Sequence, residues 1–269
     1  MAGYFQKLKC LQKSAWDSVI SVVVELEANE WDFPTDCPGW TVKDCVSHLV
    51  GIEHRLLGRE VVHPPAVDFS VAKNPQGRNN QVDVDSRKDK KISLLTDELV
   101  DVVRARGTAL ATGFDAGDQV DTPIGPGTVE QLLEMRILDC WVHEQDIRRA
   151  VGRRGNLNGD VAIHTYGQMS KIMPYVVGKK CGASDGDSVL FRINGEHSWE
   201  IPIIMESRRA HEVTSLSDPS VTIELDCEMF QCLCAGRVNS DLAIRSGDVD
   251  ISGDTTLGTM VVSEMNYMI

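Results

Sequence analysis

The sequence predicts an α+β protein, in which a helical bundle precedes a smaller domain of mixed helices and strands. The N-terminal half holds several runs in which apolar residues recur at helical spacing. After Gly155 the pattern changes to strand-like alternation with a hairpin signal. At 269 residues the chain is long for one domain and comfortable for two. We therefore expect one domain over residues 1–155 and a second over residues 156–269.

Helices account for most of the first domain. Thr41 is a typical N-cap, and Asp44 three residues later completes a capping box. Thr128 is the expected cap of a later helix and Gly152 its stop. The polar, proline-containing stretch between Gly58 and Lys91 indicates a long loop. The expected helices span about residues 5–30, 41–57, 80–89, 93–111 and 128–151, with a turn-rich TPIGPG segment before the last.

The second domain combines helices with short strands. The run Asn194-Gly195-Glu196-His197 is a hairpin signal between two strands. The expected strands span residues 188–193, 198–205, 221–226 and 249–251, and the expected helices span about residues 160–177 and 228–235, with one more at the end of the chain.

Composition limits the possible functions. The formal net charge of -13 argues against nucleic acid as the main partner. No signal peptide or bilayer-length apolar run is found, so we expect a cytosolic protein that does not insert into membranes. The eight cysteines contain no CxxC pair and are expected to be reduced, mostly buried side chains. An acidic surface without a coiled-coil repeat favours a monomer or a small homodimer.

Two aspartates and two histidines are spaced so that they could act together at one site. Asp139 and His143 lie about one helical turn apart, so both side chains leave the same face. His48 lies in another predicted helix, and the three together form the ligand set of an open, catalytic zinc site. The pair alone could instead be a hydrogen bond on a helix surface, and His48 alone a core or surface histidine. Asp146 is either an acceptor that orients His143 or a partner for Arg149.

Four neighbours of these residues are expected to have other roles. Cys140 lies beside Asp139 but about 100° around the helix, so it should point away from a metal. Glu144 is expected at the surface. Trp40 and Trp141 are expected to be packing residues, although Trp141 could form a wall of the cavity.

Three segments resemble the mycothiol-dependent maleylpyruvate isomerase family. They are TDCPGW followed by VKDCVSHL, then RILDCWVHEQDIRRAVG, and the C-terminal runs PSVTIELD, AGRV and GDVDISGD. The resemblance implies a DinB-like four-helix bundle that holds a divalent metal through His48, Asp139 and His143. Asp139 departs from the family pattern, which has a glutamate one methylene longer. The resemblance also implies a sterol-carrier-like C-terminal domain, whose Arg237 would bind substrate; the same residue could instead cap a helix.

The expected function follows from the metal and the resemblance. A thiol on a zinc ion loses its proton, and the resulting metal-bound thiolate is a nucleophile. We therefore expect a zinc- and mycothiol-dependent isomerase or S-transferase acting on a small, carboxylate-bearing substrate. Two alternatives remain open: a lipid or small-molecule binding protein with a structural metal, and a metal-dependent hydrolase.

Overall fold

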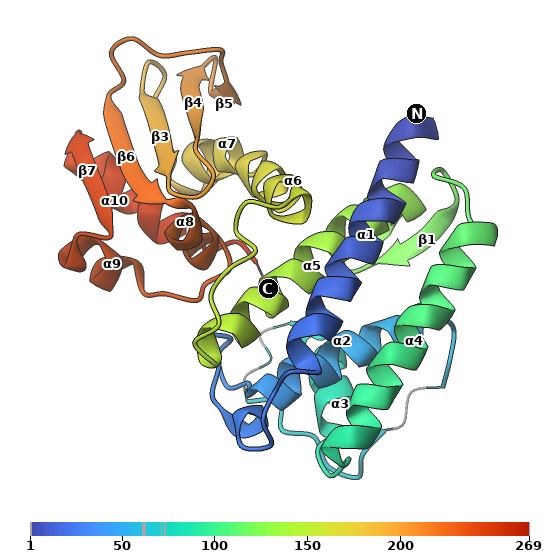
Figure 1. Ribbon diagram of the computed structural model, residues 1–269. Coiled ribbons are helices and arrows are strands. Elements are labelled where there is room, and N and C mark those ends of the chain that lie inside the picture. Colours follow the sequence, from blue (N-terminus) through green and yellow to red (C-terminus); the bar gives the residue numbers. More distant parts are fainter. Residues whose placement is uncertain (1, 61–62, 71, 73, 269) are drawn as a thin grey trace. The chain divides into compact units, whose positions relative to one another are not determined.

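The structure is a computed structural model that describes residues 2–60, 63–70, 72 and 74–268 (Figure 1). The chain divides into two compact units, Met1–Gly155 and Asn156–Met268. Residues 61, 62, 71 and 73 of the predicted long loop, and the end positions 1 and 269 of the expected domains, lie outside the described residues.

The first unit is a helical bundle with a small hairpin. Its main elements are α1 (Ala2–Val23), α2 (Val42–Leu56), α3 (Pro75–Asp85), α4 (Ile92–Thr112), α5 (Val129–Ala150) and the antiparallel strands β1 (Gln119–Thr122) and β2 (Gly125–Thr128). Helix α1 packs against α4 and α5, and α2 packs against α3, α4 and α5. The core between them is apolar and includes fully buried Leu8, Leu95, Leu99, Leu133 and Ile137. The fold is thus the expected four-helix bundle, with α3 added against α2.

Helices α2 and α5 both begin with the predicted caps. Thr41 accepts a hydrogen bond from the backbone N–H of Asp44, and the Asp44 carboxylate accepts one from Thr41 at 2.8 Å. Thr128 and Gln131 form the same reciprocal pair at the start of α5. Because each capping box satisfies two otherwise unpaired backbone donors, it determines where the helix begins. The caps therefore set the rotation of the two helices that carry the candidate ligands.

Two predictions for this unit need correction. Helix α1 ends at Val23, not near residue 30, because the charged segment that follows forms turns and a short 3-10 helix, Glu30–Asp32. Helix α3 begins at Pro75, five residues before the predicted start: the Asn74 side chain caps Gly77, and proline suits the first helical position. The TPIGPG segment contains a turn, as predicted, but the β1–β2 hairpin that this turn closes was not predicted.

The second unit is a five-stranded mixed sheet with helices packed against it. Its strands are β3 (Ser188–Asn194), β4 (Trp199–Glu206), β5 (Arg209–Glu212), β6 (Val221–Asp226) and β7 (Val249–Gly253), in the order β5-β4-β3-β6-β7. Strands β3 and β6 are parallel, and all other neighbours are antiparallel. Its helices are α6 (Asp160–Ser170), α7 (Met173–Tyr175), the π-turn η2 (Val176–Lys180), α8 (Cys227–Cys234), α9 (Ser240–Ser246) and α10 (Thr255–Glu264). Helices α8 and α10 pack against the sheet.

The sequence predicted most of this second unit. The β3–β4 hairpin, β6, β7, α8 and the final helix are confirmed. Strand β5 and helix α9 were not predicted. The helix expected over residues 160–177 is wrong as a single element: it stops at Ser170 and continues as α7 and η2, with Pro174 inside the short α7 segment. Together the two units form an α+β protein, as expected.

Across the part of the chain that the structure describes, no helix combines the length and the apolar character that a membrane span requires.

Candidate metal centre

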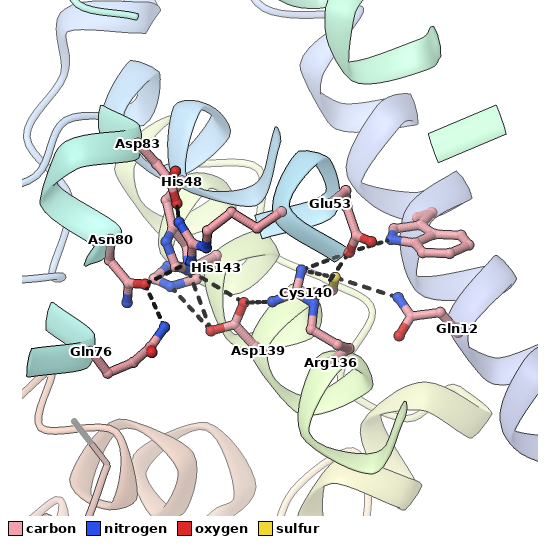
Figure 2. Close-up of polar contacts among 12 residues, drawn as sticks. Gln12, His48, Glu53, Gln76, Asn80, Asp83, Arg136, Asp139, Cys140 and His143 are labelled. Atoms are coloured by element: carbon pink, nitrogen blue, oxygen red, sulfur yellow. Dashed lines mark hydrogen bonds and ion pairs between the residues drawn. The ribbon is translucent and has the colours of Figure 1, made fainter. Parts of the chain in front are cut away.

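The three predicted ligands converge inside the first unit (Figure 2). His48 comes from α2, whereas Asp139 and His143 come from consecutive turns of α5. The Asp139 Oδ1 atom lies 3.5 Å from His48 Nε2 and 3.8 Å from His143 Nε2. One candidate ligand atom from each residue lies within 4.8 Å of the other two. Side chains 91 residues apart in the sequence therefore face one point.

The donor atoms fit an ion the size of zinc. Bonds of about 2.0–2.1 Å in a tetrahedral complex place neighbouring ligand atoms about 3.3 Å apart. The two distances from Asp139 Oδ1, 3.5 and 3.8 Å, are only slightly longer than this spacing. The Asp139 side chain, although shorter than a glutamate, thus reaches both imidazoles. Two imidazoles and one carboxylate are also the donor set of catalytic zinc sites.

The Asp146 carboxylate orients the imidazole ring of His143. Its Nδ1 atom lies 3.0 Å from Asp146 Oδ2, and Arg149 donates to the other oxygen of that carboxylate at 2.8 Å. With the proton assigned to Nδ1, the Nε2 lone pair points toward Asp139 and His48. Both sequence interpretations of Asp146 are therefore seen in the contacts, because it meets His143 and Arg149 at once. A carboxylate behind a ligating histidine is a common way to fix the ring.

The surroundings of the His48 ring differ from those of His143. Burial lowers its pKa to about 4, although the neighbouring Asp139 carboxylate acts in the opposite direction. The ring is therefore neutral near pH 7, as a metal ligand must be. Among the described residues, its Nδ1 atom has no hydrogen-bond partner. His48 thus lacks the orienting acceptor that His143 has.

Asp139 remains ionised despite its position. Burial alone would raise the pKa of this carboxyl group, but Arg136, followed by His48 and His143, holds it well below the usual value. The Arg136 guanidinium donates to Asp139 Oδ2 at 2.5 Å through Nη1. The carboxylate is therefore charged and already shared between an arginine and the two histidines.

A buried chain of charges continues behind Arg136. Its Nε and Nη2 atoms donate to Glu53 Oε1 at 3.2 and 2.8 Å, and Arg106 Nε donates to Glu53 Oε2 at 3.0 Å. The Trp16 indole also donates to Glu53, at 3.3 Å. The side chains of Arg106, Glu53 and Arg136 are only 4%, 2% and 3% exposed. Sequence reasoning missed this chain, although Arg136 lies three residues before Asp139 and hence on the same helix face.

Trp40 lies against both histidines, although it was expected to be a packing residue. Its ring centroid lies 5.0 Å from that of His48 and 5.6 Å from that of His143. Its indole N–H donates to Gln81 on α3 at 3.2 Å. Trp141 is fully buried in the core, which confirms the packing role that was expected for it. The TDCPGW loop thus contributes directly to the site.

Two further neighbours differ from their predicted roles. Glu144 is fully buried and accepts hydrogen bonds from Ser18 at 2.7 Å and Arg148 at 2.6 Å, so the predicted surface position is wrong. Cys37, expected to be only a small packing residue, lies within 4.8 Å of ligand atoms of His143 and Asp146, a second group that could hold a metal. Cys140 points away from the ligands, as predicted, and contacts Arg136 and Gln12.

A cavity of about 300 Å³ opens farther along α2. Gly51 and His54, about one and two turns after His48, line it. Glu98, another lining residue, lies 3.1 Å from His54 Nε2 and accepts from Arg87 at 3.0 Å and from Lys90 at 2.6 Å. This charged lining suits a small polar ligand better than an apolar one.

Arg237 lies in the second unit, just after α8. Its guanidinium donates to the Ala235 carbonyl oxygen at 2.8 Å, and its backbone N–H donates to Cys232. These contacts fit the helix-cap interpretation, and Gly236 has the positive φ of 66° that such an end requires. A role in substrate binding remains a prediction.

The fold and the site together define a class: a helical bundle whose facing helices present two imidazoles and one carboxylate to a common point. Residues 13–148, just over half of the chain, match the family described as mycothiol maleylpyruvate isomerase N-terminal domain. The chain belongs to this family, as the sequence motifs indicated.

Solved structures agree with this fold. The chain resembles the crystal structure of the mycothiol-dependent maleylpyruvate isomerase, with 16% identity, 92% coverage of each chain and a TM-score of 0.55. A mutant of such an isomerase matches with 15% identity, the same coverage and a TM-score of 0.57. Sterol carrier protein 2 like 2 from Aedes aegypti matches 36% of this chain and 96% of its own, with 12% identity and a TM-score of only 0.29. Among curated proteins, none matches the sequence.

Proposed function

We propose that this protein is a metal- and thiol-dependent enzyme, an isomerase or S-transferase that uses mycothiol on a small, carboxylate-bearing substrate. The observation that carries the proposal is the convergence of His48, Asp139 and His143 within 4.8 Å. Membership in the isomerase family supports the thiol and the reaction class. The domains proposed from sequence, 1–155 and 156–269, would divide the work between metal binding and substrate binding.

Zinc, bound by these three side chains, would supply the Lewis acidity that lowers the pKa of a thiol held beside it. The protein's own residues prepare the site for this role. The neutral imidazole of His48 offers a lone pair, and Asp146 fixes the ring of His143. Trp40 covers one side of the imidazole pair and limits the access of water.

The chemistry then follows from the thiolate. In an isomerase, the thiolate adds to a conjugated double bond, the new single bond rotates, and expulsion of the same thiolate restores the double bond in the other geometry. In a transferase, the thiolate displaces a leaving group and stays in the product. A substrate carboxylate needs a cation, and Arg237 is the proposed partner because a guanidinium can donate two parallel hydrogen bonds to it.

Zinc-loaded protein should convert maleylpyruvate only when mycothiol is present, and His48→Ala should abolish the reaction. His211→Ala is the matched control, because His211 is a largely exposed histidine paired with Glu206 in the second unit. Arg237→Met should raise KM more than it lowers kcat. Turnover without any thiol would select the hydrolase instead. A co-purified lipid in a protein that shows no turnover, with or without a bound metal, would select a carrier.

A further inference from the structure

The two oxygens of Asp139 have different neighbours. Oδ2 accepts the 2.5 Å hydrogen bond from Arg136 and also lies 3.4 Å from His48 Nε2, whereas Oδ1 lies 3.5 Å from His48 Nε2 and 3.8 Å from His143 Nε2 (Figure 2). We infer that Arg136 is a positioning residue that reserves Oδ2 and leaves Asp139 a single oxygen for the metal. This inference rests on the proposed metal site and concerns how the site keeps a coordination position open.

Arg136 cannot follow the carboxylate if it moves. Its Nε and Nη2 atoms are both bound to Glu53 Oε1, and the opposite oxygen of Glu53 is bound to Arg106. The guanidinium is planar, so anchoring one edge on Glu53 fixes the direction in which Nη1 points. Glu53, Arg106 and Arg136 are buried, so water cannot readily replace a contact that the guanidinium of Arg136 loses.

A free carboxylate can bind a metal through one oxygen or through both. If Asp139 used both oxygens, Oδ2 would leave Arg136 and a buried, charged donor would lose its partner. The hydrogen bond therefore favours one-oxygen binding. A second oxygen on the metal would occupy the position that a thiol or a water needs, so Arg136 protects that position indirectly.

The same geometry gives a reason for aspartate at this position. Asp139 and Arg136 lie three residues apart on α5, and the short side chain places Oδ2 on the guanidinium while Oδ1 faces the histidines. The glutamate that the family resemblance implies is one methylene longer. We infer that in this chain Arg136 and Asp139 act as a matched pair.

Arg106 provides the comparison that separates positioning from simple stabilisation. It is as buried as Arg136 and binds the same carboxylate, Glu53, yet it has no contact with Asp139 among the interactions of the described residues. A purely structural role for the charge chain predicts that loss of either arginine has the same effect. The positioning role predicts a change at the metal only for Arg136.

Cobalt(II) is the probe, because its visible absorption is intense with four ligands and becomes weak with five or six. The full-length protein, cleared of metal and loaded with one cobalt ion, should give the intense spectrum. Arg136→Met should weaken the visible band several-fold at unchanged metal content, whereas Arg106→Met should leave it unchanged. If Arg136→Met does not fold, Arg136→Lys decides, because one ammonium keeps a charge beside Glu53 but cannot span both carboxylates.

Two results would overturn the inference: an unchanged spectrum in every folded Arg136 variant, or an equal change in Arg106→Met. A weak cobalt spectrum in the unmodified protein would overturn it as well. The proposed function fails separately. If the cobalt results hold but mycothiol supports no turnover, the positioning role stands and the reaction assignment does not.

Discussion

Replacing Glu53 by glutamine tests how much the buried charges contribute to the bundle. The change keeps the shape of the side chain but removes the negative charge between Arg106 and Arg136. Both guanidinium groups are at most 4% exposed, so neither can recover its solvation in the folded state. The variant therefore leaves two buried positive charges facing a neutral amide.

The size of the effect follows from this burial. Removing one partner of a buried ion pair costs about 3–5 kcal/mol. Here two guanidinium groups bind the carboxylate that is lost, although Arg136 keeps its contact with Asp139. The amide oxygen can still accept one hydrogen bond, so we expect a loss of about 4 kcal/mol in the free energy of unfolding. The matched control is Asp101→Asn, whose pair with Arg104 is 70% and 72% exposed. The same chemical change there should cost under about 1 kcal/mol.

The measurement is urea unfolding of metal-free protein. Tryptophan fluorescence follows mainly the first unit, which holds Trp16, Trp31, Trp40 and Trp141, while Trp199 alone lies in the second. The two units can unfold separately, so the fluorescence transition of the first unit is fitted by itself. A cost for Glu53→Gln no larger than that of Asp101→Asn would refute the reasoning, because the buried network would then contribute nothing beyond a surface pair.

Three further predictions concern pH, packing and metal affinity. In the presence of a chelator, the bundle should lose on the order of 3 kcal/mol of stability as the pH falls from about 6.5 to about 4. The cause is that His48 gains a proton in the unfolded protein, whereas the folded side chain, with its pKa of about 4, resists protonation. In urea unfolding, His48→Gln should flatten this pH dependence. Gly51→Ala should cost about 1–3 kcal/mol, because the new Cβ would lie 2.2 Å from the Asp83 carboxyl carbon, whereas Gly107→Ala, with open space around it, should be neutral or stabilising in the same assay. Asp146→Asn should weaken zinc binding about 10–100-fold in chelator competition, and an unchanged affinity would remove Asp146 from the site.

Local signals predicted much of the bundle. The capping boxes at Thr41 and Thr128 depend on residues three positions apart, so they can be read directly from the sequence. The shared face of Asp139 and His143 follows in the same way from one helical turn. The predicted start of helix α3 lies too far along the chain. Its true start, Asn74-Pro75, is a recognisable cap signal, but it lies inside a polar stretch that otherwise indicates a loop.

Contacts between helices could not be predicted in this way. The burial of Glu144 depends on the position of α1, which brings Ser18 to it. The place of Trp40 over the histidines depends on how its loop crosses α2 and α5. These are distances between segments far apart in the chain, and neither periodicity nor spacing encodes them.

The sequence by itself determined most of the helices and strands, the caps that start α2 and α5, and the helix face that Asp139 shares with His143. These features depend on neighbours within a turn or two of the chain, where backbone geometry leaves little choice. Only the tertiary structure decided that Glu53 stands between Arg106 and Arg136 and that Arg136 takes one oxygen of Asp139. Such pairings depend on how packed helices rotate about their axes, and close packing of the entire core sets that rotation.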